Sequence, residues 1–147
     1  MATPEQSKAI QDRVLEIGTR LKAAPSDKLI NSVFAAELSH QAHLFEAIGL
    51  VDIAHTLIAI ELHTIPKTEG YQLLAQLLEL QKKPDTFVMT PARGDIYTNR
   101  EAWLAERTDA TGWLGAGRAR REATTSAFVL VMRQMIIESP SRDARRR

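Results

Sequence analysis

Residues 94–132 read GDIYTNREAWLAERTDATGWLGAGRARREATTSAFVLVM, and this stretch decides the fold. Its polar opening places Asp95 where a short acidic side chain can cap the free amides of a helix start. We expect that helix to run over residues 96–107 and to bury Trp103 and Leu104. A loop containing three glycines separates it from a long apolar run. The stretch therefore predicts a helix, a glycine-rich loop and a second helix.

The second helix is predicted over residues 118–138 and is apolar nearly all round, with FVLVM beginning at Phe128. A chain of 147 residues offers few partners that could cover such a helix. Because large exposed apolar surfaces mark interfaces, we expect one face of this helix to pack against another chain.

The upstream residues also carry helical signals, and no strand-like alternation of apolar and polar residues is present. A threonine cap at Thr3, followed by proline, predicts a first helix within residues 1–25. A second helical pattern begins at Asp27 and runs to about Phe45 or beyond. Gly49 is expected to interrupt or bend it.

Residues 50–63 are apolar on most faces, which predicts a helix buried between neighbours. A break at residues 64–66 precedes another helix that begins at Lys67. The stretch 82–91 contains two prolines and is predicted to be a loop. The pattern indicates an all-α domain that ends in an arginine-rich, flexible tail over residues 139–147.

Composition narrows the function classes. The chain has no cysteine, which excludes disulfides, thiolate metal ligands and a thiol nucleophile. No window approaches the roughly 20 apolar residues that a membrane span requires, and the first residues do not resemble a signal peptide. We therefore expect a soluble, cytoplasmic protein with no membrane partner.

Charge is distributed unevenly along the chain. Residues 1–92 carry 8 basic and 11 acidic side chains, whereas residues 93–147 carry 11 basic and 7 acidic ones. All the bases in the second part are arginines, whose planar guanidinium pairs with carboxylates and phosphates. The total charge is nearly neutral and aromatics are few, which makes a nucleic-acid partner unlikely.

The four histidines do not form a recognisable metal motif. His40 and His43 can share one helix face, and His55 and His63 lie on another segment. Zinc sites need three or more converging ligands, and no HExxH pattern is present. No phosphate-binding or dinucleotide glycine motif occurs either. We therefore expect no metal and no cofactor, and we interpret His55 as a packing residue.

The order of features in the opening stretch resembles a substrate-binding segment of the argininosuccinate lyases, in the aspartase/fumarase superfamily. That family has EDIHTNIE, a glycine-rich loop, GRSRND and a long apolar helix, where this chain has GDIYTNRE, a loop, GRARRE and an apolar run. Upstream, LVDIAHTLIAIELHTIPKTEGYQLLAQLLELQ resembles the first-domain helix pair of the family. Together these similarities cover roughly residues 44–137.

The resemblance implies a helical N-terminal domain that leads into the first long helix of a central bundle. A single domain would then span residues 1–138, with the helix pair and its loop at 44–92 and the substrate loop and bundle helix at 93–138. Such lyases usually assemble as tetramers, which implies a homo-oligomer.

Two further substrate-binding regions of the family have no counterpart in this sequence. One carries a Thr-His pair, and the other is a flexible loop resembling GSSxMPxKxN, whose serine is generally taken as the base. Lyase sites in this family are assembled from three subunits. A complementary C-terminal lyase half, on a separate chain, could therefore complete the site.

Six substrate-binding candidates follow from the resemblance. Arg120 matches the arginine of the SRN triplet that contacts substrate, and the residues before it match the GR of GRSRND. Thr98 and Asn99 match the last two residues of the family's HTN. The asparagine of the family's SRN triplet is replaced by Arg121. The candidates are Gly117, Arg118, Arg120, Arg121, Thr98 and Asn99.

Several departures fall in the same segment. The family's triplet serine is Ala119 here, its asparagine is Arg121, its aspartate is Glu122, and its EDIH histidine is Tyr97. Losing two polar contacts at about 1–3 kcal/mol each would weaken substrate binding strongly. Unchanged argininosuccinate chemistry is therefore not expected from this chain alone.

Three functions remain open from sequence. The chain is half of a divided lyase whose Arg120 holds a substrate carboxylate, or a noncatalytic, repurposed domain that binds a small carboxylate or a protein partner. A third possible function is that of a small enzyme with new chemistry at the same loop, in which Tyr97 or Glu122 transfers the proton.

Overall fold

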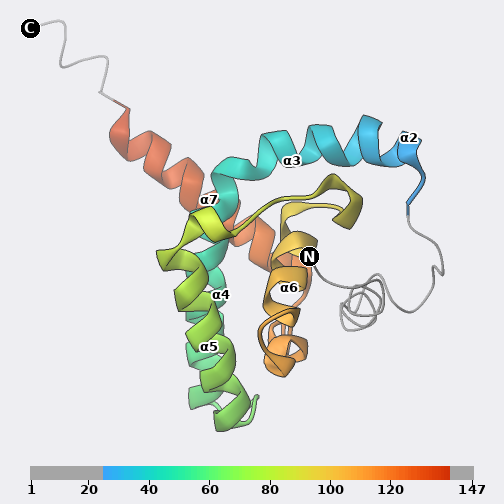
Figure 1. Ribbon diagram of the computed structural model, residues 1–147. Helices are drawn as coiled ribbons and strands as arrows, with labels where there is room; N and C mark the ends of the chain where they lie inside the picture. Colours follow the sequence, from blue (N-terminus) through green and yellow to red (C-terminus); the bar gives the residue numbers. More distant parts are fainter. Residues whose placement is uncertain (1–24, 140–147) are drawn as a thin grey trace, which may run out of the picture.

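The computed structural model of the protein describes residues 25–139, and these residues form helices and short helical turns with no strand (Figure 1). The predicted all-α class is confirmed. The helix predicted within residues 1–25 and the tail predicted within residues 139–147 lie almost wholly outside the described range.

Most described residues belong to six α-helices of very different length. These are α2 (Asp27–Leu29), α3 (Ala35–Gln41), α4 (Phe45–Glu61), α5 (Lys67–Lys82), α6 (Ile96–Ala105) and α7 (Arg120–Glu138). Five short helical segments connect the α-helices. They are the π-helix η1 (Ile30–Phe34) and the 3-10 helices η2 (Ala42–Leu44), η3 (Pro84–Thr86), η4 (Pro91–Arg93) and η5 (Asp109–Trp113).

Helices α2 and α3, joined by η1, form an arm across the top of the molecule, and the chain bends at η2 before α4 begins (Figure 1). The expectation that Gly49 interrupts this helix was wrong, because Gly49 lies inside α4 and is buried there. A β-carbon at Gly49 would overlap Oε1 of Gln81 on α5. The glycine therefore lies within a regular helix, facing the Gln81 side chain, and does not bend the chain.

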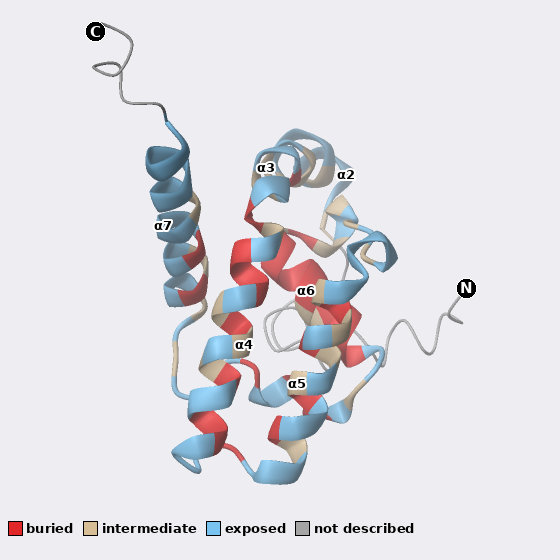
Figure 2. Cartoon of the chain, turned by 90° about the vertical axis from the view of Figure 1, so that its left-hand side faces the viewer, coloured by how far each residue is buried: buried red, intermediate tan, exposed pale blue. Residues whose placement is uncertain are grey.

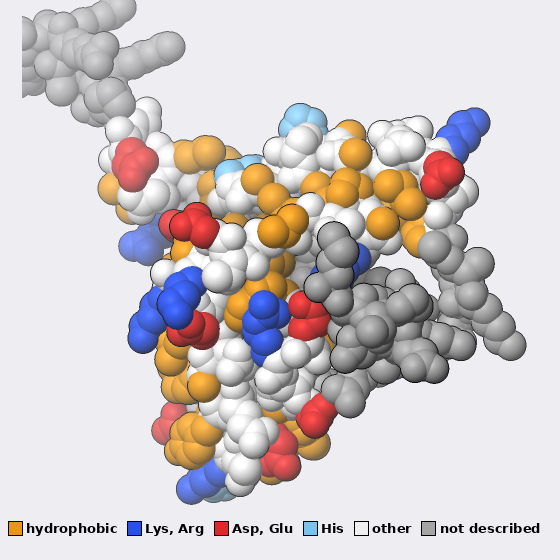
Figure 3. Space-filling model, viewed as in Figure 1, with side chains coloured by type: hydrophobic (Ala, Val, Ile, Leu, Met, Phe, Trp, Pro, Cys, Tyr) orange, Lys and Arg blue, Asp and Glu red, His pale blue; other side chains and the backbone are white. Residues whose placement is uncertain are grey.

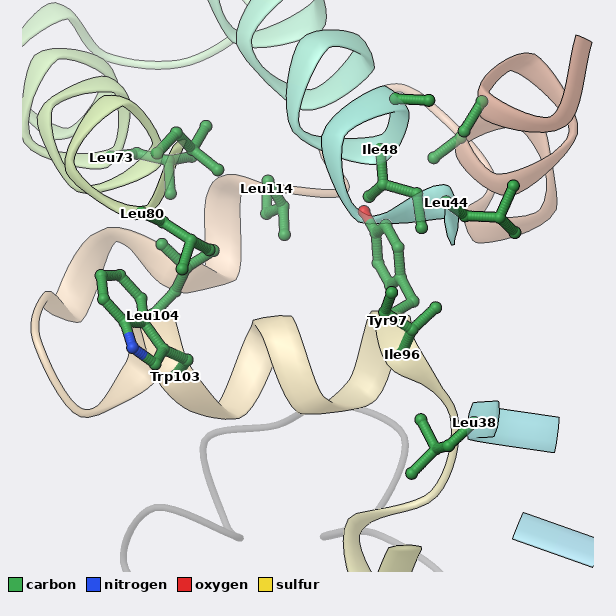
Figure 4. Close-up of a cluster of buried hydrophobic side chains, with 14 of the residues drawn as sticks. Leu38, Leu44, Ile48, Leu73, Leu80, Ile96, Tyr97, Trp103, Leu104 and Leu114 are labelled. Atoms are coloured by element: carbon green, nitrogen blue, oxygen red, sulfur yellow. The ribbon is translucent and has the colours of Figure 1, made fainter. Parts of the chain in front are cut away.

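Helices α4 and α5 form an antiparallel hairpin, with α6 beside it (Figure 1). The start of α5 is as predicted: Pro66 adopts an extended backbone and Lys67 is the first helical residue. Gly70 permits the close contact within the hairpin, since a β-carbon there would overlap Cγ1 of Ile60. The hairpin and α6 enclose the main core, and Figure 4 shows Tyr97 pointing from α6 toward α4.

The core joins side chains from every long helix and from the loop before α7. Its fully buried members include Ile48 on α4, Leu73, Leu77 and Leu80 on α5, Ile96 and Leu104 on α6, Leu114 in the loop, and Ala127 on α7. Trp103 and Leu104 are buried as predicted.

Two helices expose more apolar surface than a core helix would. Residues 50–63 were expected to be buried on most faces, but Leu50, Leu57 and Ile58 are each about half exposed. Helix α7 packs on α4 and η2 through its first half, where Ala123 and Ala127 are buried. From Met132 onward its residues are all exposed (Figure 2). The reason is the same in both cases: the described residues supply no neighbour for these faces.

The continuous helical stretch Asp27–Glu61 is long and apolar enough, by length and composition, to cross a membrane. This corrects the sequence-based expectation that no window would qualify. In this structure 44% of its most apolar window is buried inside the protein. The stretch also bends at η2 and contains Asp52, which is fully buried. Its buried side chains pack against α5 and α7.

Candidate functional site

The first turn of α6 is the structural centre of the candidate site. Asp95 caps this helix, because its Oδ1 accepts hydrogen bonds from the backbone N–H of Thr98 at 2.9 Å and from its hydroxyl at 3.0 Å. The predicted cap is therefore confirmed. The helix ends at Ala105, slightly earlier than expected. Two of the three predicted arginines of the GRARRE segment, Arg118 and Arg120, contact this turn.

Arg118 reaches into the protein from the residue before the N-cap of α7. Its Nη2 donates to Oδ1 of Asp52 on α4 and, at 2.9 Å, to the hydroxyl oxygen of Tyr97. The side chain of Arg118 is 7% exposed and that of Asp52 is fully buried. A second arginine, Arg100 on α6, donates to the other carboxylate oxygen of Asp52 at 3.1 Å and is also fully buried.

Arg120 is the first residue of α7 and lies nearer the surface. Its Nη2 donates to Oδ1 of Asp95 and, at 2.6 Å, to the hydroxyl oxygen of Thr98. Its guanidinium carbon lies 5.2 Å from the centre of the Tyr97 ring, a cation–π distance. Burial lowers the pKa of Arg120. The two arginines are therefore held by one helix turn, Arg118 through Tyr97 and Arg120 through Asp95 and Thr98.

The buried cluster around Asp52 contains more donors than acceptors. Nε and Nη1 of both Arg100 and Arg118 are buried and have no hydrogen-bond partner among residues 25–139. Oε2 of Glu101 is likewise buried and unbonded within that range. Burial, and then repulsion from Asp95 and Asp52, raise the pKa of Glu101 to about 7. Two buried guanidinium groups thus share the carboxylate of Asp52.

Thr98 and Asn99 are both buried and do not form an exposed helix face. Thr98 takes part in the Arg120 contacts. The Asn99 amide holds the loop before α6, since its oxygen accepts from the N–H of Thr90 and its nitrogen donates to the carbonyls of Thr90, Gly94 and Asp95. These bonds use the hydrogen-bonding capacity of the amide. Asn99 therefore positions Asp95 and has little capacity left for a ligand.

The glycine-rich loop is anchored by His55, whose Nε2 lies 2.9 Å from the carbonyl oxygen of Ala116. This contact agrees with a structural role for His55. Burial and the nearby charge of Arg118 lower the pKa of the His55 imidazole. Gly117 has a φ of 75°, a conformation that favours glycine. The glycine therefore turns the chain so that the following arginine points inward.

Several backbone N–H groups of this loop already donate hydrogen bonds within the protein. The N–H of Ala116 donates to the carbonyl of Trp113, and the N–H of Arg118 donates to that of Gly115. The N–H of Ala119 donates to Oε2 of Glu122 at 2.6 Å. The site is thus built from side-chain cations more than from a nest of free backbone donors.

Glu122 and Arg121 lie on the exposed side of the α7 start. Glu122 reaches back to the N-cap amide, which is one half of a capping box; the other half is lacking because Ala119 has no side-chain oxygen. Tyr97 is buried, and desolvation and Asp52 raise its pKa. Tyr97 therefore resists ionisation, and the Glu122 carboxylate is already bonded to the N-cap amide, so neither side chain is arranged as a general base.

Sequence reasoning did not identify Asp52, Arg100 or Glu101 as members of this cluster. One signal was available, because Asp52 interrupts an otherwise apolar helix segment, and a carboxylate buried in a core needs a cationic partner. Residues 25–139 hold no cluster of three or more His, Asp or Glu side chains suited to a metal ion.

Comparison with known proteins identifies one group of relatives. The chain is 28% identical over 108 residues to the argininosuccinate lyase of Methanococcus maripaludis strain C5, covering 71% of this chain and 22% of that enzyme. It is 26% identical over 107 residues to the argininosuccinate lyase of Methanocaldococcus jannaschii, with coverage of 71% and 22%. It is 26% identical over 120 residues to the argininosuccinate lyase of Methanococcoides burtonii, covering 80% of this chain and 24% of that enzyme.

No family model matches the chain, and no solved structure matches it. The chain spans 22–24% of the length of these curated relatives. Over that part, it is a sequence relative of the argininosuccinate lyases.

Proposed function

We propose that this chain contributes the carboxylate-binding part of a β-elimination site of the argininosuccinate lyase type, which other chains complete. Arg120 pairs with a carboxylate of the substrate. Arg118 and the first turn of α6 hold the start of α7 in place. We also propose a cytoplasmic location, which the relation to these lyases supports.

One observation carries this proposal: Arg118 and Arg120 both contact the first turn of α6, which brings two guanidinium groups together at the start of α7. The buried Arg118 also keeps two donor nitrogens without a partner among the described residues. A helix N-terminus adds a favourable field for anions. Cationic side chains that are fixed before the reaction stabilise charge that develops during it.

The proposed chemistry needs such charge. In the elimination, a base removes a proton from the carbon beside a carboxylate, the bond between the neighbouring carbon and nitrogen breaks, and the nitrogen takes up a proton. Fumarate and an amine-bearing product result. Negative charge builds up on the carboxylate next to the reacting carbon, and a guanidinium paired with that carboxylate lowers the barrier.

The proton-transfer groups are proposed to come from another chain. Tyr97 has a raised pKa, which opposes its ionisation to a base, and Glu122 is engaged in capping α7. This chain alone is therefore expected to be inactive in the family reaction. The same two observations weigh against the reading of a small enzyme with new chemistry at Tyr97 or Glu122.

The exposed half of α7 is the surface proposed to receive the completing chain. Phe128, Met135, Ile136 and Ile137 are each more than half exposed. A second copy of this chain, or a complementary C-terminal lyase half, would bury them.

A second candidate function is a noncatalytic domain that binds a small carboxylate or a protein partner. It is favoured by Ala119, which has no hydroxyl to offer a ligand, and by Arg121, which lies on the exposed side of α7. When the ligand is a small carboxylate, both functions use Arg120 in the same way and differ only in turnover.

Native purification of the protein from its source cells, followed by mass spectrometry and an assay for argininosuccinate cleavage, tests the proposal. A stoichiometric partner that carries the GSS-type loop, together with fumarate release, would support the divided lyase. A homo-oligomer without turnover would reject the catalytic proposal and leave the noncatalytic candidate.

A further inference from the structure

The Arg120 guanidinium already holds a carboxylate in this structure. Its Nη2 donates to Oδ1 of Asp95, and Thr98 joins the pair by donating to the same oxygen and accepting from Arg120. The side chains of Arg120 and Asp95 are 24% and 26% exposed. Asp95 therefore occupies the kind of position on Arg120 that an incoming carboxylate would take.

Capping of α6 does not require the negative charge of Asp95. The cap consists of Oδ1 accepting from the N–H of Thr98, and a neutral asparagine or serine provides an oxygen of similar capping strength. The charge of Asp95 instead acts on Arg120. Charge-assisted hydrogen bonds are about twice as strong as neutral ones, so this contact competes with any external anion that approaches Arg120.

We propose that Asp95 is an internal competitor that lowers the affinity of Arg120 for small carboxylates, so that a ligand must displace it before it can pair with the guanidinium. This inference rests on the proposed function of Arg120. Asp95 is thus a residue that sets affinity and selectivity: a weakly bound monocarboxylate fails to displace it, whereas a dicarboxylate with a second anchoring point succeeds.

The geometry also explains why displacement is feasible. The contact is at the protein surface, with about a quarter of each side chain exposed, so water can replace the lost partner of Asp95. The deeper Asp52 pair is fully buried and has no such route. Only Arg120 can therefore exchange its carboxylate partner. Arg118 stays paired with Asp52 and holds the loop in place.

Calorimetric titration of succinate into the full-length wild-type protein and into Asp95→Asn tests the inference. Asp95→Asn keeps the cap and removes the competing charge, so succinate should bind about tenfold more tightly. Asp85→Asn is the matched control, because Asp85 is exposed in η3 and its substitution changes the net charge equally. The control should bind as the wild type does. Asp95→Ser provides a second neutral cap if the asparagine variant does not fold.

The outcomes separate the two proposals. Tighter binding by Asp95→Asn, abolished by adding Arg120→Ala, supports internal competition. Equal or weaker binding by Asp95→Asn overturns it and leaves the carboxylate site itself standing. Absence of succinate binding in the wild type and in both neutral-cap variants overturns both proposals.

Discussion

Arg118 and Asp52 lie 66 positions apart in the sequence and form an ion pair whose carboxylate is fully buried. The pair joins the loop before α7 to the middle of α4, and Arg100 on α6 binds the same carboxylate. Three separate parts of the chain thus meet at one buried charge. The orientation of the candidate site depends on this junction.

Asp52→Asn should destabilise the protein strongly, because it leaves two buried guanidinium groups without a counter-charge. Breaking a buried pair in this way costs about 3–5 kcal/mol. Urea unfolding followed by circular dichroism would measure the loss. Asp85→Asn, on the exposed turn η3, should change the free energy of unfolding by less than about 0.5 kcal/mol. Similar values for the two variants would show that the Asp52 cluster contributes little.

Glu101 should make stability depend on pH near neutrality. Its pKa is raised from 4.5 to about 7 in the folded protein, so folding favours the protonated form. The resulting stabilisation is complete below the unfolded pKa and is lost as pH rises through about 7. Glu101→Gln removes the ionisation and should raise the free energy of unfolding at pH 8, by up to about 3 kcal/mol, with little effect at pH 4. The groups that face Glu101 electrostatically are Asp95, Asp52 and Arg118. A difference between wild type and variant that does not change with pH would contradict this assignment.

Two glycines of the α4–α5 hairpin should respond differently to alanine. A methyl at Gly70 meets Cγ1 of the buried Ile60, so Gly70→Ala should cost about 1–3 kcal/mol. A methyl at Gly49 meets only the Gln81 side-chain amide, which can rotate away, and alanine gains up to about 1 kcal/mol in a helix interior. Gly49→Ala should therefore be nearly neutral. Thermal unfolding of both variants would reveal the difference, and equal losses would mean that Gln81 cannot move.

The exposed half of α7 should mediate self-association or capture of the completing chain. Ile136→Lys should shift the protein toward the monomer in sedimentation equilibrium, because it places a charge in the proposed interface. Leu62→Lys is a matched control on the hairpin tip, since both side chains are 69% exposed. A monomeric wild type, or equal effects of the two substitutions, would remove α7 as a self-association interface.

Local features of this fold were predictable, and long-range ones were not. Asp95 caps α6 and Lys67 begins α5, as cap chemistry and proline placement indicate. The role of Gly49 was missed because a helix propensity does not reveal the Gln81 side chain on the opposite helix.

The candidate site was only partly predictable for the same reason. Arg118 and Arg120 follow from the motif, but their different partners depend on tertiary packing. The pairing of Asp52 with two arginines joins residues from α4, α6 and the loop, and no periodic pattern encodes it. Asn99 matched the motif of the lyases, and yet its amide is used to hold the loop before α6.

Succinate-induced thermal stabilisation of the wild type, Arg120→Ala and Arg133→Ala tests most directly whether Arg120 forms a carboxylate site. Arg133 is an exposed arginine on the same helix and serves as the control. A ligand at about 100 times its Kd stabilises the folded state by about 2.7 kcal/mol. We predict that succinate raises the melting temperature of the wild type and of Arg133→Ala in a concentration-dependent way, but not that of Arg120→Ala. An equal rise in all three proteins would contradict the assignment of Arg120 as the carboxylate-binding residue.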